Sequence, residues 1–308
     1  MKNVNILIII SLTHVRNYNV FCTGEIINQK GCIVLKNSRG IYRPILIITL
    51  ALLQLVMMCG CAHQNPDDSG ISSRPKLIIG SDNYEPYNYI SGTGGFTGVD
   101  VEIAREALSR MGYEPVFKQI IWGNKDDYLE DGSIDCLWGC FTMTGREDRY
   151  QWTCPYLYSR QMVVVRADSS ISSLSELRDK RIAVQATSKP EEIFLEGSNK
   201  HIPKPEMVYS FSTMDEVYAC LRKGYADAIC GHDSALDSLI RTSPADYRKL
   251  RESVYKSEIG VAFSKDFNRG IVDRLSETLT EMRNDGTIAD IAGKYSMDKD
   301  VLLEVTGK

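Results

Sequence analysis

The sequence is poor in the residues that build metal and redox sites. Its 308 residues include only four histidines, and none of its nine cysteines belongs to a CxxC pair. Structural zinc sites need four closely spaced Cys or His ligands, so a zinc site is not indicated. Neither GxGxxG nor a GxxxxGKS/T sequence occurs, which removes the common phosphate-binding loops of nucleotide sites. We therefore expect no metal and no cofactor.

A strong excess of basic charge is also absent. The formal net charge is −4, and no basic stripe interleaved with aromatic residues is present, so nucleic acid is not an expected partner. Hydrophobic residues make up 43% of the chain and charged residues 25%, as in ordinary globular proteins. The length is too great for one small core and indicates two compact lobes plus an N-terminal extension.

A charge-free apolar run covers residues 44–58, with basic residues before it and Cys59-Gly60-Cys61 after it. This order is typical of a secretory signal, and the run is shorter than the roughly 20 residues of a stable membrane span. Its end resembles a bacterial lipoprotein signal, so Cys61 is the expected lipidated residue and Cys59 the alternative. An uncleaved anchor helix is the other interpretation.

Residues 1–33 do not fit a signal peptide, because an apolar segment that begins at residue 44 lies too deep in the chain. Val34 or Leu35 is therefore a hypothetical alternative start. We assign residues 1–61 to an N-terminal extension with a lipoprotein-type signal, and the polar residues 62–75 to a tether. Together they predict an extracytoplasmic protein that is lipid-anchored to the cell membrane.

From residue 76 onward, short apolar runs alternate with helical patterns. Strands are predicted at 76–80, 114–121, 134–138, 161–166, 181–185, 207–209, 228–230 and 258–263. Helices are predicted at 101–111 with Asp100 as its cap, at 126–131, at 173–178, from 187–190 onward, and at 214–223, 234–240, 269–284 and 287–295. Strand–helix–strand units with short links favour parallel α/β sheets.

The runs at 161–166 and 258–263 flank a self-contained α/β block. This arrangement is typical of a second lobe inserted into the first through a hinge of two strands. We therefore predict lobe 1 at residues 76–160 plus 264–308, and lobe 2 at residues 166–256.

Five cysteines lie in the globular part of the chain. Cys136, Cys220 and Cys230 are expected to be small buried side chains. A bridge between Cys140 and Cys154 is conceivable, but five is an odd number, so at least one of these thiols has no partner within the domain.

Several short motifs occur in a fixed order. They are KLIIG from Lys76, YEPYNY from Tyr84, GVDVEI from Gly98, GSID from Gly132, TMT with Arg146, PY at Pro155, RIAVQ from Arg181, GYADA from Gly224 and NDGTI from Asn284. Over residues 76–296 the set resembles the bacterial extracytoplasmic solute-binding proteins of family 3, the polar amino-acid receptors of ABC importers. Asp179 stands where that family usually has glycine, so the turn into the next strand is expected to differ.

The resemblance implies an α/β fold of the two-lobed periplasmic-binding-protein type II, often called a flytrap, with a two-strand hinge. It implies a receptor that captures a polar amino acid between its lobes and delivers it to an ABC transporter permease. An amino-acid sensor that acts in trans on a membrane signalling protein is the alternative. A dehydratase on the same fold is a weaker one, because no histidine has a partner pattern for acid–base catalysis.

An amino acid offers a carboxylate, for which the planar fork of arginine is the natural partner. Arg146 stands where the family has its carboxylate-binding arginine, counted back from Pro155. Counted forward from Thr142 it comes one residue early, so the loop is shortened and Arg149 is the alternative. The plain interpretation of Arg146 is a surface side chain paired with an adjacent acid.

Other expected contacts come from both lobes. Thr142 and the backbone of Cys140 are expected to bind the ligand's charged ends. Thr187 and Ser188 precede a helix with Pro190 at its start, where free N–H groups attract anions. The resemblance implies that Asp233 accepts the ligand's ammonium group. Local turns and helix caps are the simpler explanation for these hydroxyls and for Asp233.

The resemblance also assigns aromatic and selectivity positions. Tyr84 and Trp122 are expected to sandwich the aliphatic part of the ligand, since aromatic faces suit hydrocarbon and cationic groups. Asp82 and Gln185 stand where selectivity for the ligand's side chain is set. An ordinary core position for Trp122 and a turn for Asp82 are the alternatives.

Overall fold

The computed structural model describes residues 74–197, 199 and 201–297. The predicted signal, Cys59, Cys61 and nearly all of the tether lie outside the described residues. By its internal contacts the chain divides into Met1–Ile71 and Ser72–Lys308, and the described residues all belong to the second unit. Within its described part, no helix has the length and apolar character that crossing a bilayer requires.

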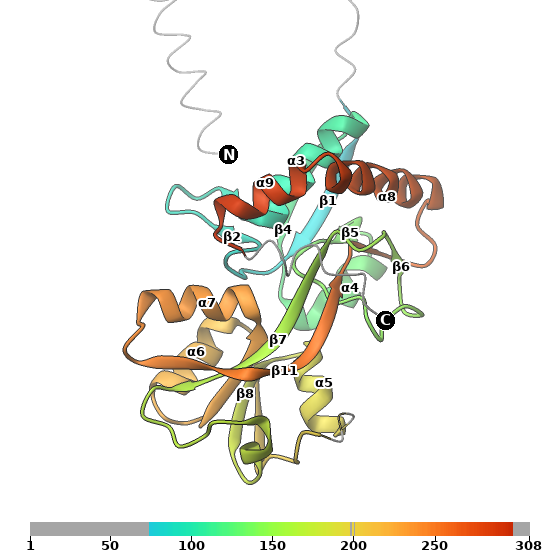
Figure 1. Cartoon of the computed structure of the whole chain (residues 1–308). Coiled ribbons are helices and arrows are strands. Elements are labelled where there is room, and N and C mark those ends of the chain that lie inside the picture. Colours follow the sequence, from blue (N-terminus) through green and yellow to red (C-terminus); the bar gives the residue numbers. More distant parts are fainter. Residues whose placement is uncertain (1–73, 198, 200, 298–308) are drawn as a thin grey trace, which may run out of the picture. The chain divides into compact units, whose positions relative to one another are not determined.

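The first sheet has the strand order β4-β1-β5-β12-β6. Its strands are β1 (Lys76–Ser81), β4 (Glu114–Gln119), β5 (Cys136–Leu137), β6 (Gln151–Trp152) and β12 (Ala262–Phe263). Helices α3 (Val99–Met111), α8 (Arg269–Asn284) and α9 (Thr287–Lys294) pack together beside it (Figure 1). The smaller elements are β2 (Tyr89–Ile90), β3 (Phe96–Thr97), the 3-10 turn η1 (Trp122–Asn124) and α4 (Lys125–Glu130). We call this assembly lobe 1.

The second sheet has the order β11-β7-β10-β8-β9. Its strands are β7 (Leu157–Arg166), β8 (Arg181–Gln185), β9 (Met207–Phe211), β10 (Ala228–His232) and β11 (Tyr247–Ile259). Its helices are α5 (Lys189–Glu196), α6 (Met214–Arg222) and α7 (Asp233–Thr242), with the 3-10 turn η2 (Leu174–Leu177). We call it lobe 2. The helix predicted at 173–178 is thus only a 3-10 turn.

Both sheets are mixed rather than wholly parallel, which corrects the prediction. Strands joined by helices are parallel, as in the pairs β1–β4 and β8–β9. By contrast, β12 is antiparallel to β5, and β7 is antiparallel to both β10 and β11. The alternation of strands and helices predicts only those strand pairs that a helix joins. It does not predict antiparallel pairs between segments that are distant in the sequence.

Two long strands connect the lobes. β7 and β11 pair antiparallel from Leu157 opposite Ile259 to Arg166 opposite Tyr247, with irregular register after Lys249 (Figure 1). The predicted strand at 258–263 is therefore wrong in extent, because β11 ends at Ile259 and β12 begins separately. Most of β11 was missed, since its polar sequence YRKLRESVYKS lacks clean alternation.

Asp100 does not cap its helix as predicted. The N-cap is Gly98 at φ 124°, where a Cβ atom would lie 2.3 Å from the carbonyl oxygen of Tyr87. Only glycine tolerates both that conformation and that close approach. The buried Asp100 carboxylate instead accepts hydrogen bonds from the Cys140 N–H at 2.6 Å and the Tyr156 hydroxyl at 2.9 Å. It thereby fixes the loop that follows β5.

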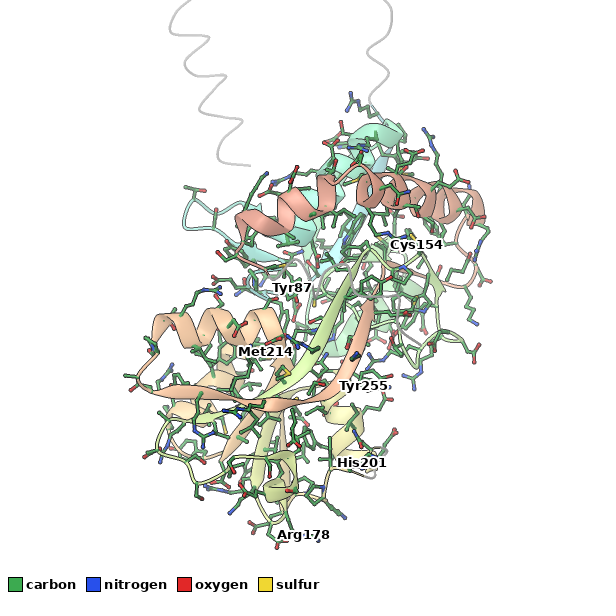
Figure 2. All side chains as sticks on the ribbon, in the orientation of Figure 1. Tyr87, Cys154, Arg178, His201, Met214 and Tyr255 are labelled. Carbon is green, nitrogen blue, oxygen red and sulfur yellow. The ribbon has the colours of Figure 1, made fainter. Side chains whose placement is uncertain are left out.

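The cysteines of the described region are all reduced. Cys136, Cys220 and Cys230 are buried, as predicted. Cys140 and Cys154 form no bridge. The Sγ of Cys154, labelled in Figure 2, lies 3.4 Å from the Thr280 hydroxyl on α8.

The turn before β8 keeps a left-handed backbone despite its lost glycine. Asp179 occupies it at φ 55°. Aspartate is among the few residues that adopt this conformation at modest cost. The turn was expected to differ from that of the family. It differs in residue type, but its backbone has the left-handed conformation that a glycine would also adopt.

Candidate functional site

A cavity of about 30 Å³ lies where residues of the two lobes meet. It is lined by Asp82, Tyr84, Trp122, Gly139, Cys140, Phe141, Arg146, Gln161, Gln185, Thr187, Ser188, Pro190, Met214, Cys230, Gly231 and His232. Met214, labelled in Figure 2, is the first residue of α6. This volume holds about one water molecule and is far smaller than ligand pockets, which measure hundreds of Å³. The structure is thus a closed state of the two lobes.

Most of the predicted site residues meet at this cavity. They are Asp82, Tyr84, Trp122, Cys140, Arg146, Gln185, Thr187 and Ser188. Thr142 and Asp233 do not line it. Gln161, Phe141, Met214 and His232 were not predicted, and Arg149 is exposed outside the lining.

Arg146 is held inside the cavity wall by groups from both lobes. Its side chain is 5% exposed. It donates to the Thr142 carbonyl at 3.3 Å, the Thr187 carbonyl at 3.4 Å and the Glu192 carboxylate at 3.3 Å. Burial lowers the pKa of Arg146, and the charge of Glu192 opposes that shift. Its partner is therefore an acid of lobe 2 and not one of its chain neighbours.

Glu192 is shared between two cations. One carboxylate oxygen accepts from Arg146, and the other accepts from the Lys189 ammonium. Lys189 is 7% exposed, and its ammonium lies 5.3 Å from the ring centroid of Tyr255 on β11. Tyr255 is labelled in Figure 2. One oxygen of the Glu192 carboxylate thus bonds to one terminal nitrogen of the Arg146 guanidinium, the group that the family resemblance assigns to a ligand carboxylate.

The start of α5 is both a helix cap and a polar edge of the cavity. Ser188 is the N-cap, and its Oγ accepts from the Glu191 N–H at 3.3 Å and donates to the Gln185 carbonyl at 2.6 Å. Thr187 has the left-handed φ of 56°. A β-branched residue adopts this conformation only under strain, which is often concentrated at binding sites.

Asp82 is the only acid among the lining residues. Its carboxylate accepts a hydrogen bond from Gln185 of lobe 2. Burial raises the pKa of Asp82 to about 6, against the lowering effects of Gln185 and Lys125. A cationic group of a ligand would find its one charged acceptor in the cavity here.

Asp233 has another role than the expected one. It is the first residue of α7, and its carboxylate pairs with Arg160 at 2.9 Å and with Lys249. A carboxylate already neutralised by two cations, and absent from the cavity lining, is not a suitable ammonium acceptor. The preceding residue, His232, faces the cavity instead, because adjacent residues at a strand end point to opposite sides.

His232 and Gln161 form a buried polar pair in the cavity wall. The Gln161 amide nitrogen lies 3.0 Å from His232 Nε2, and the backbone N–H of His232 donates to the Tyr84 hydroxyl at 3.0 Å. Burial lowers the pKa of His232 to about 3, so its ring is neutral at physiological pH. Among the described residues, the buried Gln161 Oε1 has no hydrogen-bond partner, which makes it an available acceptor for a ligand.

Aromatic rings form the wall next to Arg146. Trp122 and Phe141 meet edge to face at 5.0 Å between centroids. The guanidinium carbon of Arg146 lies 5.5 Å from the Phe141 centroid. Thr142 is buried behind this wall and contributes its carbonyl to Arg146, while its backbone bridges to Ile259. Its hydroxyl was predicted to contact the ligand, but Thr142 lies outside the cavity lining.

The family model of the bacterial extracellular solute-binding proteins, family 3, matches residues 77–298. The chain belongs to this family. Its members are binding proteins, so the protein is a solute-binding receptor and not an enzyme. Because this family consists of extracellular proteins, the protein functions outside the cytoplasm.

Three relatives of this family member illustrate the similarity. The L-cystine-binding protein TcyA of Bacillus subtilis (strain 168) is 24% identical over 81% of this chain and 94% of its own. The arginine-binding extracellular protein ArtP of the same organism is 25% identical over 82% and 96%. The crystal structure of Tv2483 bound to L-arginine has a TM-score of 0.68 and 26% identity, covering 75% of this chain and 95% of that one. The predicted two-lobed type II fold is confirmed.

Proposed function

We propose that this family member captures a polar amino acid between its lobes and delivers it to the permease of an ABC importer. The observation that carries the proposal is Arg146, a buried guanidinium at the cavity wall that is held by the opposite lobe. The relatives that bind cystine and arginine support an amino acid as the ligand. The lobe boundaries 76–160 plus 264–308 and 166–256 are part of this proposal.

Binding requires that the lobes first separate, because the closed cavity is too small for an amino acid. The ligand carboxylate then takes the place of Glu192 on Arg146, next to the N-terminus of α5 and Ser188. Its ammonium group is accepted by Asp82 and by Gln161 Oε1, which replace Asp233 in this role. Closure excludes water and strengthens these charge-assisted bonds.

The remaining contacts complete the recognition. Tyr84 and Trp122 cover the aliphatic part of the ligand, and Gln185 bridges the lobes to Asp82. The backbones of Cys140 and Thr187 lie at the two sides of the cavity, each with a left-handed φ. Only the closed state makes both sets of contacts, so the ligand shifts the population of lobe arrangements toward closure.

Substitution of Arg146 tests the proposal, with Arg149 as the matched control. A thermal-shift screen of amino acids identifies the ligand, since a ligand that binds only the folded protein raises apparent stability. In calorimetry, Arg146→Ala is expected to weaken binding by at least about 100-fold, or ~3 kcal/mol, because the carboxylate loses its charged partner. Arg149→Ala should bind normally, since that side chain is exposed. Unchanged affinity in the Arg146 variant refutes the assignment.

We also propose a lipid anchor at Cys61, in support of an extracytoplasmic, membrane-attached receptor. The apolar run at 44–58 followed by Gly60-Cys61 motivates the assignment. When the protein is produced in a bacterium fed labelled palmitate, Cys59→Ala should keep the label and Cys61→Ala should lose it. Label retained in the Cys61 variant would rule out that residue as the lipidated one.

A further inference from the structure

Lys125 is a buried cation whose ammonium group makes no hydrogen bond to a carboxylate of the described residues. It begins α4 and is 4% exposed. Within 4.0 Å its Nζ meets one carboxylate oxygen of the described residues, that of Asp126 at 3.9 Å, which is beyond hydrogen-bond range. Asp126 itself is half exposed and accepts from the Tyr150 hydroxyl. Buried lysines are normally paired, since desolvating an ammonium group is costly.

The ammonium group of Lys125 lies against the aromatic wall of the cavity. Its Nζ is 5.6 Å from the Trp122 centroid and 5.9 Å from the Phe141 centroid. Both rings line the cavity, whereas Lys125 itself lies outside the lining. The Arg146 guanidinium lies 5.5 Å from the same Phe141 ring. Burial lowers the pKa of Lys125, and the charge of Arg146 adds to that shift while Asp126 opposes it. Two cations thus share one wall.

Among the described residues, the acids around the cavity leave Lys125 without a hydrogen-bonded carboxylate, since Asp126 and Glu191 act on it only through their charges. Glu192 is shared by Arg146 and Lys189, and Asp233 is neutralised outside the lining. Asp82 remains, and a ligand ammonium group would use it. An amino acid with a neutral side chain would therefore satisfy Arg146 and Asp82 but leave Lys125 without a partner. A ligand with a second anionic group would balance all three.

We propose that Lys125 is a second anion-binding residue of the cleft, and that the ligand is an amino acid carrying a second carboxylate. This inference rests on the proposed function, in which Arg146 binds the α-carboxylate. The long flexible stem of lysine lets the ammonium swing from the two rings to the ligand when the lobes part. In the ligand-free state, the faces of the two aromatic rings hold the Lys125 ammonium group.

Calorimetry on the full-length chain tests the inference with charged ligands and their uncharged amides. L-Glutamate and L-aspartate supply a second carboxylate without a second ammonium group, whereas their amides L-glutamine and L-asparagine, and the cationic L-arginine, do not. The wild-type protein should bind at least one of the first group about tenfold or more tightly than any of the second. Lys125→Met should remove that preference and leave binding of the amides unchanged, and Lys125→Arg should retain it.

The variants separate ligand binding from stability. Lys125→Met should fold at least as well as the wild type, because it replaces a desolvated charge by an apolar chain of similar length; its thermal unfolding checks this. Equal losses for acid and amide in that variant would overturn the inference, as would a wild-type preference for neutral or cationic side chains. If no amino acid binds, or if Arg146→Ala binds normally, the proposed function itself fails.

Discussion

Arg146 and Glu192 form an ion pair that, under the proposed function, would link ligand binding to lobe closure. The pair is formed between lobes, with Arg146 from the loop after β5 and Glu192 from α5. In the proposed binding mode, a ligand carboxylate competes with Glu192 for the guanidinium. The affinity expected from calorimetry is then the difference between two charge-assisted contacts, and not the full value of one. Once displaced, Glu192 still has Lys189 as a partner, which limits the cost of releasing it.

Asp82 gives the folded protein a characteristic pH dependence. Its pKa rises from 3.8 to about 6 on folding because burial disfavours the charged form. The stability that the protonated group contributes is complete below about pH 4 and is lost as the pH rises through 6. A shift of about two pKa units corresponds to ~3 kcal/mol. The free energy of unfolding of Asp82→Asn, relative to wild type, should therefore increase by about that amount from pH 4 to pH 7.

Urea denaturation at a series of pH values measures this difference. His232 titrates with the opposite sign, since its pKa is lowered to about 3 and its contribution is lost as the pH falls. It is present in both proteins, so its effect cancels in the comparison. Parallel stability profiles for the wild type and the variant would contradict the assignment of a raised pKa to Asp82.

At the residue scale, the sequence predicted the position of a side chain where a motif fixed it, and missed the position where side-chain direction decided it. Ser188 was recognisable because a hydroxyl precedes Pro190 at a helix start. The family resemblance pointed to Asp233, but its neighbour His232 lines the cavity, and a one-residue step at a strand end reverses the side that a side chain occupies. Gln161 carries no local signal, because it resembles any polar residue in an apolar strand.

At the scale of elements, local patterns located most strands and helices. The strand β8 and the helix α8 have the predicted bounds, since each has a clear period and clear ends. Prediction failed for β11, whose polar residues pair along β7 rather than facing a core on alternate positions. Its two register irregularities further obscure any period of two. Long-range pairing, and not local preference, makes this segment a strand.

The loop from Gly139 to Arg146 shows the same limit. In sequence it reads as a short polar connection. Its shape depends on Asp100, which reaches from α3 to the Cys140 N–H, and on Thr144, whose hydroxyl accepts from the Glu258 N–H at 3.0 Å. Such contacts between distant segments position Arg146, and they are invisible to periodicity.

At the scale of the whole described unit, the strands β7 and β11 are the connection between the lobes. They pair with each other over most of their lengths, so they are the segments that a hinge movement of the lobes would bend. The composition and the strand–helix rhythm predicted two lobes and two connections. The closed state, with Glu192 inserted at Arg146, depends on contacts between the lobes and became visible only in the structure.

The most direct test is a crystal structure of the protein with the amino acid identified by the thermal-shift screen. We expect the ligand's α-carboxylate within hydrogen-bond distance of the Arg146 guanidinium, its ammonium group at Asp82, and Glu192 withdrawn from Arg146. A bound amino acid with the Arg146–Glu192 pair intact, or with its carboxylate on Arg149, would contradict this mode of binding.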